Sequence, residues 1–213
     1  ISVAWQLRRR GIEAVLYELE GRLGGKFSRV IPESRIPGEV IATELERVRR
    51  VLPLVALRQP LGREEFLRLR EEFDAVVIAV GARKPRSLPL AGIERAVSAL
   101  AFLEAAKAGE ASVGRRVAVI GAGNVGCDAA TEAFRLGAQE VTLLDIQRPA
   151  AFGKERRAAE AAGARFRWPV RIREITAAGV RLEAGEEIPA ETVIVAVGDQ
   201  PDLDFLPAAI ERE

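Results

Sequence analysis

The sequence predicts an α/β protein built from two similar units, each with a parallel sheet. Apolar runs without alternation, such as residues 117–120 and 192–197, suit strands that are buried on both faces of such a sheet. Helical stretches with one apolar face lie between these runs, and glycines close several of them. The segments DAVVIAVGA (74–82) and ETVIVAVGD (191–199) have nearly the same pattern. We interpret them as copies of one strand and its turn, which indicates two units.

Composition and charge narrow the range of partners. The chain has 213 residues, of which 48% are hydrophobic and 30% charged, so it can bury the core of one large or two small domains. Its 32 basic and 31 acidic residues give a net charge of +1 without long blocks of like charge, so nucleic acid is not expected as a partner. No apolar run approaches the ~20 residues of a membrane helix, and no signal peptide is recognised. We therefore expect no membrane association and a cytoplasmic location.

Few side chains are suited to acid, base or metal chemistry. The sequence has no His, which excludes a Ser-His or Cys-His pair and a His-ligated zinc within the chain. The single cysteine, Cys127, can form neither an internal disulfide nor a C-x-x-C pair, and we interpret it as a packing residue rather than a reactive thiol. We predict no catalytic side chain and no metal ligand. Activity must then rest on a bound cofactor or on binding alone.

The first elements are a helix over residues 2–10 and a short strand over 14–17 that ends at Glu18. This order matches the second half of a nucleotide-binding unit, in which an acid at the strand end meets a ribose. The first strand and its glycine turn would lie before the first residue, so whether the chain is a fragment of a longer protein stays open. Glu18 is either a ribose ligand or a solvated acid. Gly24 and Gly25, which follow closely, strengthen the first alternative.

Helices and strands then alternate up to residue 111. The predicted elements are a helix at 39–52, a strand at 54–57, a helix at 62–73 and a buried strand at 74–80. Gly81 closes the last strand, at a turn that lies either near a cofactor or simply at a strand end. A linker with Pro and Gly (83–92) and a helix (96–108) lead to the second unit.

The segment 116–145 carries the clearest motif in the chain. Gly121, Gly123 and Gly126 stand at the spacing G-x-G-x-x-G, directly after a buried strand and before a helix at 127–136. Gly121 permits the tight turn, Gly123 lets the backbone approach a pyrophosphate, and Gly126 lets the helix pack on the strand. The order of strand, turn and helix is that of a Rossmann-like dinucleotide-binding fold, and a structural turn without a ligand is the alternative.

The same segment supplies groups for phosphate and ribose. The helix N-terminus, with Asn124 and Val125, presents free N–H groups and a positive pole to a phosphate. The next strand (141–144) ends at Asp145, whose carboxylate can accept hydrogen bonds from a ribose 2′-OH, which favours NAD(H). Arg148 could reach a 2′-phosphate, so NADP(H) is not excluded. A solvated surface charge is the other interpretation of Arg148.

The last third of the sequence completes this unit. A helix at 154–162 and a strand at 164–168 are followed by short runs separated by glycines, which predict an antiparallel meander at 171–176, 180–183 and 187–188. A final strand at 192–197 is closed by Gly198.

Four segments resemble the small subunit of glutamate synthase and its relatives, which are FAD- and NAD(P)H-dependent oxidoreductases. They are GRLGGKFSRVIPESRIPGEV (21–40), AVGARKPRSL (79–88), GAGNVGCDAA (121–130) and IVAVGDQPD (194–202). The sequence departs from the family pattern at Ser34, where an aromatic residue is expected, and at Val80, where Thr is common. The family's opening glycine fingerprint and its closing flavin-binding segment lie outside the sequence.

The resemblance implies two Rossmann-like dinucleotide-binding domains. These are a partial FAD-binding domain (1–92), a linker and helix (93–111), an NAD(P)-binding domain with an antiparallel β-meander (112–200) and the start of a return to the FAD domain (201–213). It also implies that the flavin is bound with the help of Glu18, Gly24, Gly25 and Gly81. Gly198, which closes the corresponding turn of the second domain, is likewise predicted to bind a cofactor.

The reaction implied is hydride transfer from NAD(P)H to FAD, with electrons passed on to an acceptor, a partner subunit or an iron-sulfur domain. Such a step needs bound and oriented rings more than acid or base groups. Cys127 alone cannot hold an iron-sulfur cluster, so a cluster would lie in another segment or chain. Two alternatives stay open. One is a module that binds or senses NAD(H) without turning it over, and the other is an NAD-linked dehydrogenase without flavin, for which only Tyr17 and a few lysines could act as acid or base.

Overall fold

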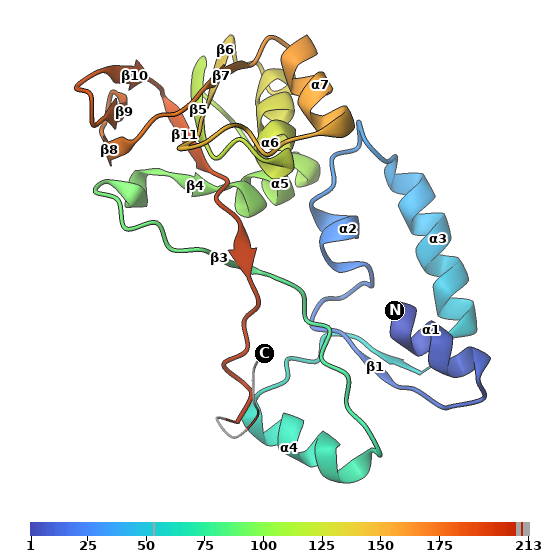
Figure 1. The fold of residues 1–213 in the computed structure, drawn as a ribbon. Helices are drawn as coiled ribbons and strands as arrows, with labels where there is room; N and C mark the ends of the chain where they lie inside the picture. The colour runs from blue at the N-terminus through green and yellow to red at the C-terminus, as the bar shows by residue number, and fades with distance from the viewer. Residues whose placement is uncertain (53, 208–209, 211–213) are drawn as a thin grey trace. The chain divides into compact units, whose positions relative to one another are not determined.

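A computed structural model describes residues 1–52, 54–207 and 210 of the chain. It divides into two compact units, which we call unit 1 (residues 1–84 and 200–213) and unit 2 (residues 85–199) (Figure 1). The chain passes from one unit to the other twice, at β3 (Lys84–Pro85) and β12 (Asp199–Gln200), and these two strands pair with each other. Residues 85–111, which the sequence assigned to the end of the first domain and to a linker, lie in unit 2.

Unit 2 is built on a five-stranded sheet in which every pair of neighbours is parallel. Its central strand is β5 (Arg116–Ile120), which has a neighbouring strand on each edge and is covered on both faces. Val119 on this strand is therefore 0% exposed. The strand order is β4 (Val97–Ser98), β11 (Thr192–Val195), β5 (Arg116–Ile120), β6 (Glu140–Leu144) and β7 (Arg165–Arg167). The predicted α/β fold with parallel sheets is confirmed.

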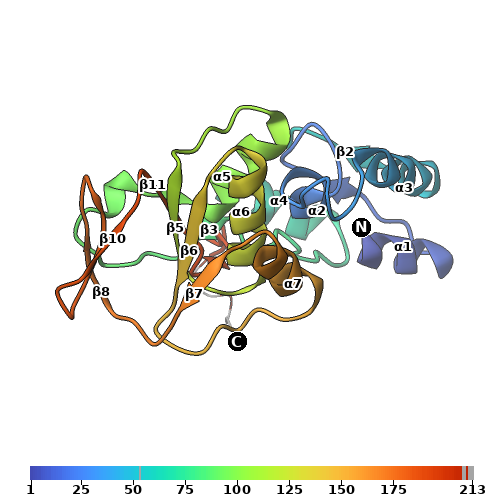
Figure 2. The same cartoon turned by 90° about the horizontal axis from the view of Figure 1, so that it is seen from above.

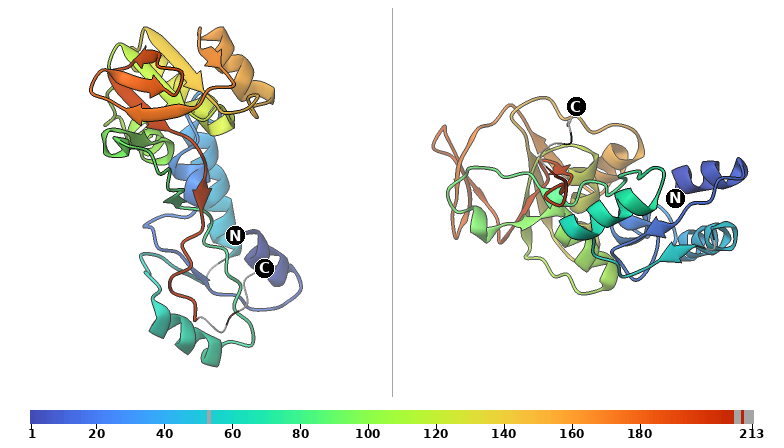
Figure 3. Two further views of the ribbon diagram at one scale, coloured as in Figure 1. Left: turned by 60° about the vertical axis from the view of Figure 1, so that its left-hand side comes forward. Right: turned by 90° about the horizontal axis from the view of Figure 1, so that it is seen from below.

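Helices cover one face of this sheet, and a small antiparallel meander covers the other, as Figure 2 shows from above and the right-hand view of Figure 3 from below. Side chains alternate along the strands. Ile120 and Leu144 therefore join the meander residue Val180 in one buried cluster. The helices are α5 (Ala99–Ala108), α6 (Asn124–Arg135) and α7 (Gly153–Ala161).

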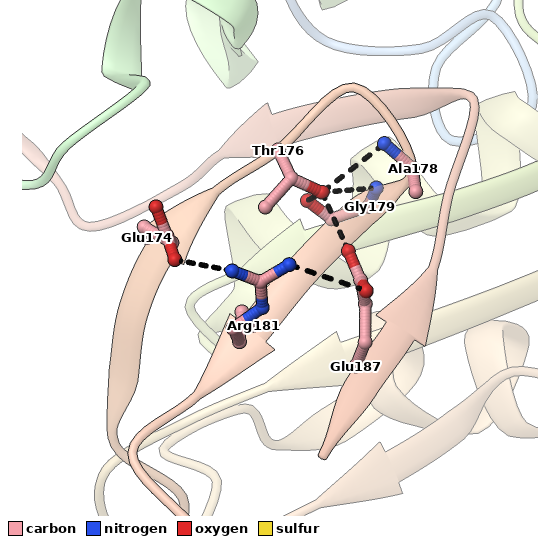
Figure 4. Close-up of polar contacts among 6 residues, drawn as sticks. All are labelled: Glu174, Thr176, Ala178, Gly179, Arg181 and Glu187. Carbon is pink, nitrogen blue, oxygen red and sulfur yellow. Dashed lines mark hydrogen bonds and ion pairs between the residues drawn. The ribbon is translucent and has the colours of Figure 1, made fainter. Parts of the chain in front are cut away.

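The predicted meander is present, in the order β10-β9-β8. Figure 4 shows how one guanidinium ties its three strands together. Arg181 on the middle strand binds Glu174 at 2.7 Å on one neighbour and Glu187 at 3.5 Å on the other. The strands are β8 (Ile172–Ile175), β9 (Gly179–Leu182) and β10 (Glu187–Pro189).

Thr176 adds a second polar contact at the turn between β8 and β9. Its hydroxyl donates to a Glu187 carboxylate oxygen at 2.6 Å and accepts from the backbone N–H of Gly179 at 3.1 Å (Figure 4). The hydrogen bond from Thr176 and then the charge of Arg181 hold the pKa of Glu187 below its usual value. Because these groups are near solvent, we assign them a role in strand register rather than a large share of stability.

Unit 1 contains four α-helices and a short parallel pair of strands within its described residues. Ile41 and Phe66 are each 3% exposed and belong to its core. Phe66 also meets Phe205 edge to face, with ring centroids 5.7 Å apart, so the returning chain packs on the helix that carries Phe66, α4 (Arg63–Glu72). The elements are α1 (Ser2–Arg9), β1 (Leu16–Tyr17), α2 (Gly25–Arg29), α3 (Gly38–Val51), β2 (Val55–Ala56) and α4 (Arg63–Glu72).

The prediction of a buried strand at residues 74–80 is wrong. The segment has no regular structure, and Val76, Val77, Ile78 and Val80 are between 37% and 58% exposed. A strand requires a neighbour for its N–H and C=O groups. Within the described part of the chain, β1 pairs only with β2, and neither of these strands pairs with residues 74–80.

Among the described residues, no helix has the length and apolar character needed to cross a membrane.

Candidate functional site

In the turn between β5 and α6, contacts within the protein itself require glycine at two positions. Gly121 has a φ of +107°, and a Cβ there would lie 2.4 Å from the carbonyl oxygen of Ala196. A Cβ on Gly126 would lie 2.1 Å from the carbonyl oxygen of Gly121. Side chains at either position would force the turn away from β11 or α6 away from β5. These contacts explain the first and last glycines of the motif.

Gly123 has no such internal reason to be glycine. Its φ of −84° is open to any residue, and a Cβ there would meet no protein atom within 4 Å. The protein backbone is therefore bare on this side of the turn. A glycine at this point keeps space for a group from outside the chain, as expected where a pyrophosphate approaches the backbone.

The first turn of α6 offers several free hydrogen-bond donors. Its N-cap is Gly123, which has no side chain to cap the helix, and the first intrahelical bond runs from Cys127 N–H to Gly123 O at 3.0 Å. In the described ranges the backbone N–H groups of Asn124, Val125 and Gly126 have no acceptor. Unsatisfied N–H groups at the positive end of a helix are donors of the kind that bind anions in proteins.

Asp145 lies directly on the glycine turn. One carboxylate oxygen accepts from the backbone N–H of Ala122 at 2.8 Å, and the other accepts from that of Gln147 at 3.1 Å. The structure thus brings together the glycines and the acid that were predicted to act on one ligand. Each oxygen retains a lone pair for a further donor such as a ribose hydroxyl.

The segment after Asp145, which we call the 145–152 loop, is fastened to the same turn. Ala151 N–H donates to Ala122 O at 3.1 Å, and Phe152 N–H donates to the Asn124 side-chain oxygen at 2.9 Å. Asn124, expected to bind the cofactor, therefore uses its amide oxygen to hold this loop. No local sequence pattern predicts this contact, because its two residues lie 28 positions apart.

Two further residues of unit 2 bear on the chemistry. Arg148 is exposed on the 145–152 loop, and no carboxylate among the described residues forms an ion pair with it. Cys127 is fully buried on α6, where burial, and then the nearby charge of Asp128, raise its pKa to about 11. Its thiol is therefore protonated at neutral pH, as suits a packing residue. Gly198 accepts a hydrogen bond from Arg86 N–H at 3.1 Å and lies beside β12.

One predicted residue of unit 1, Glu18, lies at the end of β1. Glu18 follows this strand, and its carboxylate accepts from the backbone N–H of Glu20 at 3.0 Å. Arg83 and Arg29 both pair with Glu20, the former at 3.0 Å. A cavity of about 350 Å³ at this strand end is lined by Glu20, Gly21, Arg22 and Arg29. Sequence reasoning did not single out these arginines, because charged side chains in a loop look solvated when their neighbours are unknown.

The glycines predicted on the flavin side differ in surroundings. Gly24 and Gly25 open α2 with φ of +109° and +50°, and a Cβ on Gly24 would lie 2.9 Å from Ser28 Cβ. Gly25 and Gly81 have positive φ, and no protein atom lies within 4 Å of where a Cβ would be. Backbone conformation thus explains all three glycines without a ligand.

The comparisons with known proteins place this geometry in context. The family model described as pyridine nucleotide-disulphide oxidoreductase matches residues 1–213. The NADP(+)-dependent formate dehydrogenase subunit beta of Moorella thermoacetica is 28% identical over 99% of this chain and 35% of its own length. The NAD-dependent dihydropyrimidine dehydrogenase subunit PreT of Escherichia coli is 29% identical over 93% of this chain and 51% of its own. A putative glutamate synthase [NADPH] small chain of Cereibacter sphaeroides is 31% identical over 68% of this chain and 38% of its own.

The chain therefore spans between about a third and a half of the length of these relatives. Solved structures agree with the fold. Thioredoxin reductase of T. acidophilum superposes with a TM-score of 0.70 over 96% of this chain and 75% of its own, at 17% identity. A 2-naphthoyl-CoA reductase superposes with a TM-score of 0.72 over 92% of this chain and 31% of its own, at 22% identity.

Proposed function

The chain belongs to the pyridine nucleotide-disulphide oxidoreductase family, and from this premise we propose that it takes part in hydride transfer from NAD(P)H to FAD. We further propose that it is a member like the glutamate synthase small subunit, which passes electrons to an acceptor or a partner subunit. The relatives support this proposal, since they are named as subunits of formate dehydrogenase and dihydropyrimidine dehydrogenase and as a glutamate synthase small chain.

One observation carries the nucleotide part of the proposal. A bare backbone at Gly123, three free N–H groups on α6 and the Asp145 carboxylate all meet at one turn. Together they suit a diphosphate with an attached ribose, since donors face the charge and an acceptor faces the sugar hydroxyls. We assign this ligand as NAD(H), with NADP(H) as the alternative because Arg148 lies on the 145–152 loop.

The residues of unit 1 fit part of an FAD molecule. Glu18 presents an acceptor at a strand end, and the neighbouring cavity is lined by Arg22 and by the ion pair of Arg29 with Glu20. We propose that this strand end binds the ribose and phosphate region of FAD. Gly24, Gly25 and Gly81 would contribute backbone rather than side chains. The flavin, when bound, supplies the capacity to accept a hydride and release electrons singly.

This chain's own side chains then have binding and orienting roles. The proposed reaction does not require an acid or base, which agrees with a sequence that has no His. One cysteine cannot hold an iron-sulfur cluster, so a cluster that accepts the electrons would lie in another segment or chain. A separate NAD(H)-binding or sensing module is the second candidate function. Residues 74–80 favour it because they pair with no strand, so the parallel sheet in the described part of unit 1 has two strands.

A visible absorption spectrum tests the proposal. The purified protein, mixed with FAD and freed of excess, should show flavin bands that bleach when NADH is added without oxygen. NADH binding without flavin bands would instead support the binding module. A protein that binds neither FAD nor NADH would contradict both functions, and the Gly123→Val variant serves as a control that should lose only the NADH response.

A further inference from the structure

The irregular segment after α4 is fastened to the rest of unit 1 by an ion pair at its end. Among the residues that the structure describes, no backbone group of residues 74–82 takes part in a hydrogen bond. Arg83 follows this stretch, and its guanidinium contacts a carboxylate oxygen of Glu20 at 3.0 Å. Gly81, which the resemblance assigns to the flavin, lies two residues before Arg83. The contact between Arg83 and Glu20 therefore holds the chain that carries Gly81.

Glu20 also holds other groups around the end of β1. Its backbone N–H donates to a carboxylate oxygen of Glu18 at 3.0 Å, and its carbonyl oxygen accepts from the N–H of Arg58 at 3.0 Å. The carboxylate oxygen that meets Arg83 also pairs with Arg29 of α2. One residue thus joins the end of β1, the start of the chain after β2, α2 and the segment that ends at Arg83.

The backbone of Arg58 indicates that this arrangement is fixed by the fold. Arg58 has a φ of +57° and is the one non-glycine residue with a positive φ in the part of the chain that the structure describes. A residue with a side chain keeps this conformation only where its surroundings determine it. A Cβ on Gly21 would lie 3.2 Å from Nε of Arg58, so glycine at position 21 leaves room for the guanidinium. The surroundings of Glu20 are therefore specific.

The charge of Glu20 is directed at groups inside the protein. Its side chain is 29% exposed, and two guanidinium groups share one of its carboxylate oxygens. Salt screens such a partly buried group less than it screens a fully exposed pair. A carboxylate with these partners orients its neighbours, because its charge is already balanced by arginines.

We propose that Glu20 is a positioning residue for FAD, which holds Glu18 on one side of the flavin nucleotide and Gly81 on the other at a fixed separation. The inference rests on the proposed function, because it takes both of these residues to meet FAD. Glu20 acts through Arg83 and through its own backbone, and its side chain does not touch the cofactor. A ligand that reaches both sides needs the contact between Glu20 and Arg83. A ligand that reaches only the ribose and phosphate region at Glu18 does not.

The first test needs no cofactor. Trypsin cleaves after Arg83 only when the guanidinium leaves its carboxylate partner and enters the protease. Glu20→Gln keeps the backbone groups of residue 20 and removes the charge. In limited digestion of the full chain, it should raise the rate of cleavage after Arg83 about fivefold, which corresponds to the loss of one favourable ion pair. Mass spectrometry identifies the cut by the fragments 1–83 and 84–213.

The second test compares FAD with ADP, which lacks the flavin. Calorimetry on the full chain gives the dissociation constants of both ligands. Glu20→Gln should weaken FAD about fivefold and leave ADP unchanged, since the contact with Glu18 is made by the backbone of residue 20. Arg83→Gln should cause a similar loss. The double variant should lose no more than either single variant, because both changes remove the same interaction.

Glu72→Gln is the matched control, because Glu72 pairs with Arg68 at 3.7 Å on α4 of the same unit. It should change neither the cleavage after Arg83 nor either affinity. Unchanged cleavage in Glu20→Gln would overturn the inference while the proposed function stands. Faster cleavage with unchanged FAD affinity would also overturn it, as would equal losses for FAD and ADP, which indicate a general loss of structure. A wild-type chain that binds no FAD would overturn the proposed flavin function itself, and the positioning role with it.

Discussion

Residues 74–82 and 191–199 have almost the same sequence pattern and different structures. In unit 2 the pattern forms β11, which pairs with β4 and β5, and Ile194 is 0% exposed. In unit 1 the equivalent Val77 is 58% exposed in a segment without regular structure. The two copies share apolar residues, length and a closing glycine. They differ in whether strands lie on either side.

The difference shows that an apolar run can form a buried strand, but that the run alone does not decide whether it is buried. β11 has its N–H and C=O groups satisfied by neighbours on both edges, and α5 and the meander cover its faces. Residues 74–80 have neither kind of neighbour among the described residues of unit 1. Backbone pairing and apolar burial come together, because each requires adjacent strands.

The largest effect is expected when a charge is placed in each copy. Ile194→Asp buries a carboxylate in the centre of the sheet and should lower the free energy of unfolding of unit 2 by more than about 4 kcal/mol. Val77→Asp, its matched variant, should change unit 1 by no more than about 0.5 kcal/mol, as is usual for an exposed position. Urea unfolding followed by fluorescence reports each unit, since Trp168 lies in unit 2 and Trp5 in unit 1.

Comparable losses in the two variants would contradict the comparison. They would mean that residues 74–80 are buried by a strand in solution, as the sequence had predicted. Val77→Thr and Ile194→Thr extend the test with smaller perturbations and the same expected order.

In the glycine turn after β5, Gly126 is expected to have a structural role and Gly123 a ligand-binding role. Gly126→Ala would place a methyl 2.1 Å from Gly121 O and should cost about 1–3 kcal/mol of stability through forced repacking. Gly123→Ala, which meets no protein atom, should leave thermal stability unchanged and weaken NADH at least tenfold. Melting curves and calorimetry on both variants check this. A Gly123→Ala variant that binds NADH normally would remove the diphosphate from the turn.

Prediction from sequence succeeded where the local pattern and its neighbours agree. The sequence predicted the turn at the G-x-G-x-x-G motif, the strands around it and the meander, because each depends on residues close in sequence. The attachment of Phe152 to Asn124 and the arginines near Glu20 were not anticipated. These contacts join residues far apart or in irregular segments, where no periodicity reports a partner. The prediction of a strand at residues 74–80 was wrong for a related reason, because a strand forms only where another strand supplies hydrogen-bond partners for its backbone.

A smaller effect is expected for the choice between nicotinamide cofactors. Asp145→Ala removes the acceptor for a ribose 2′-OH and should weaken NADH about tenfold while changing NADPH less, since a 2′-phosphate makes no use of a carboxylate. Arg148→Ala should have the opposite preference and weaken NADPH more. Dissociation constants for both cofactors and both variants decide the matter. Equal losses in Asp145→Ala would place that residue in turn stability rather than at the ribose, because it also accepts from Ala122 and Gln147.

The smallest expected effect is a dependence of stability on pH that is confined to unit 2. Cys127 is buried in unit 2, and its pKa is raised to about 11 from an ordinary value of 9.0. The folded state therefore keeps this proton where the unfolded state has lost it, so the contribution is constant below pH 9 and the stability of unit 2 falls as pH rises toward 11. The loss should reach about 1 kcal/mol at pH 10. Fluorescence of Trp168 should report the fall, and Cys127→Ala should abolish it. A fall that persists in Cys127→Ala, or that Trp5 reports equally, would assign the titration to other groups.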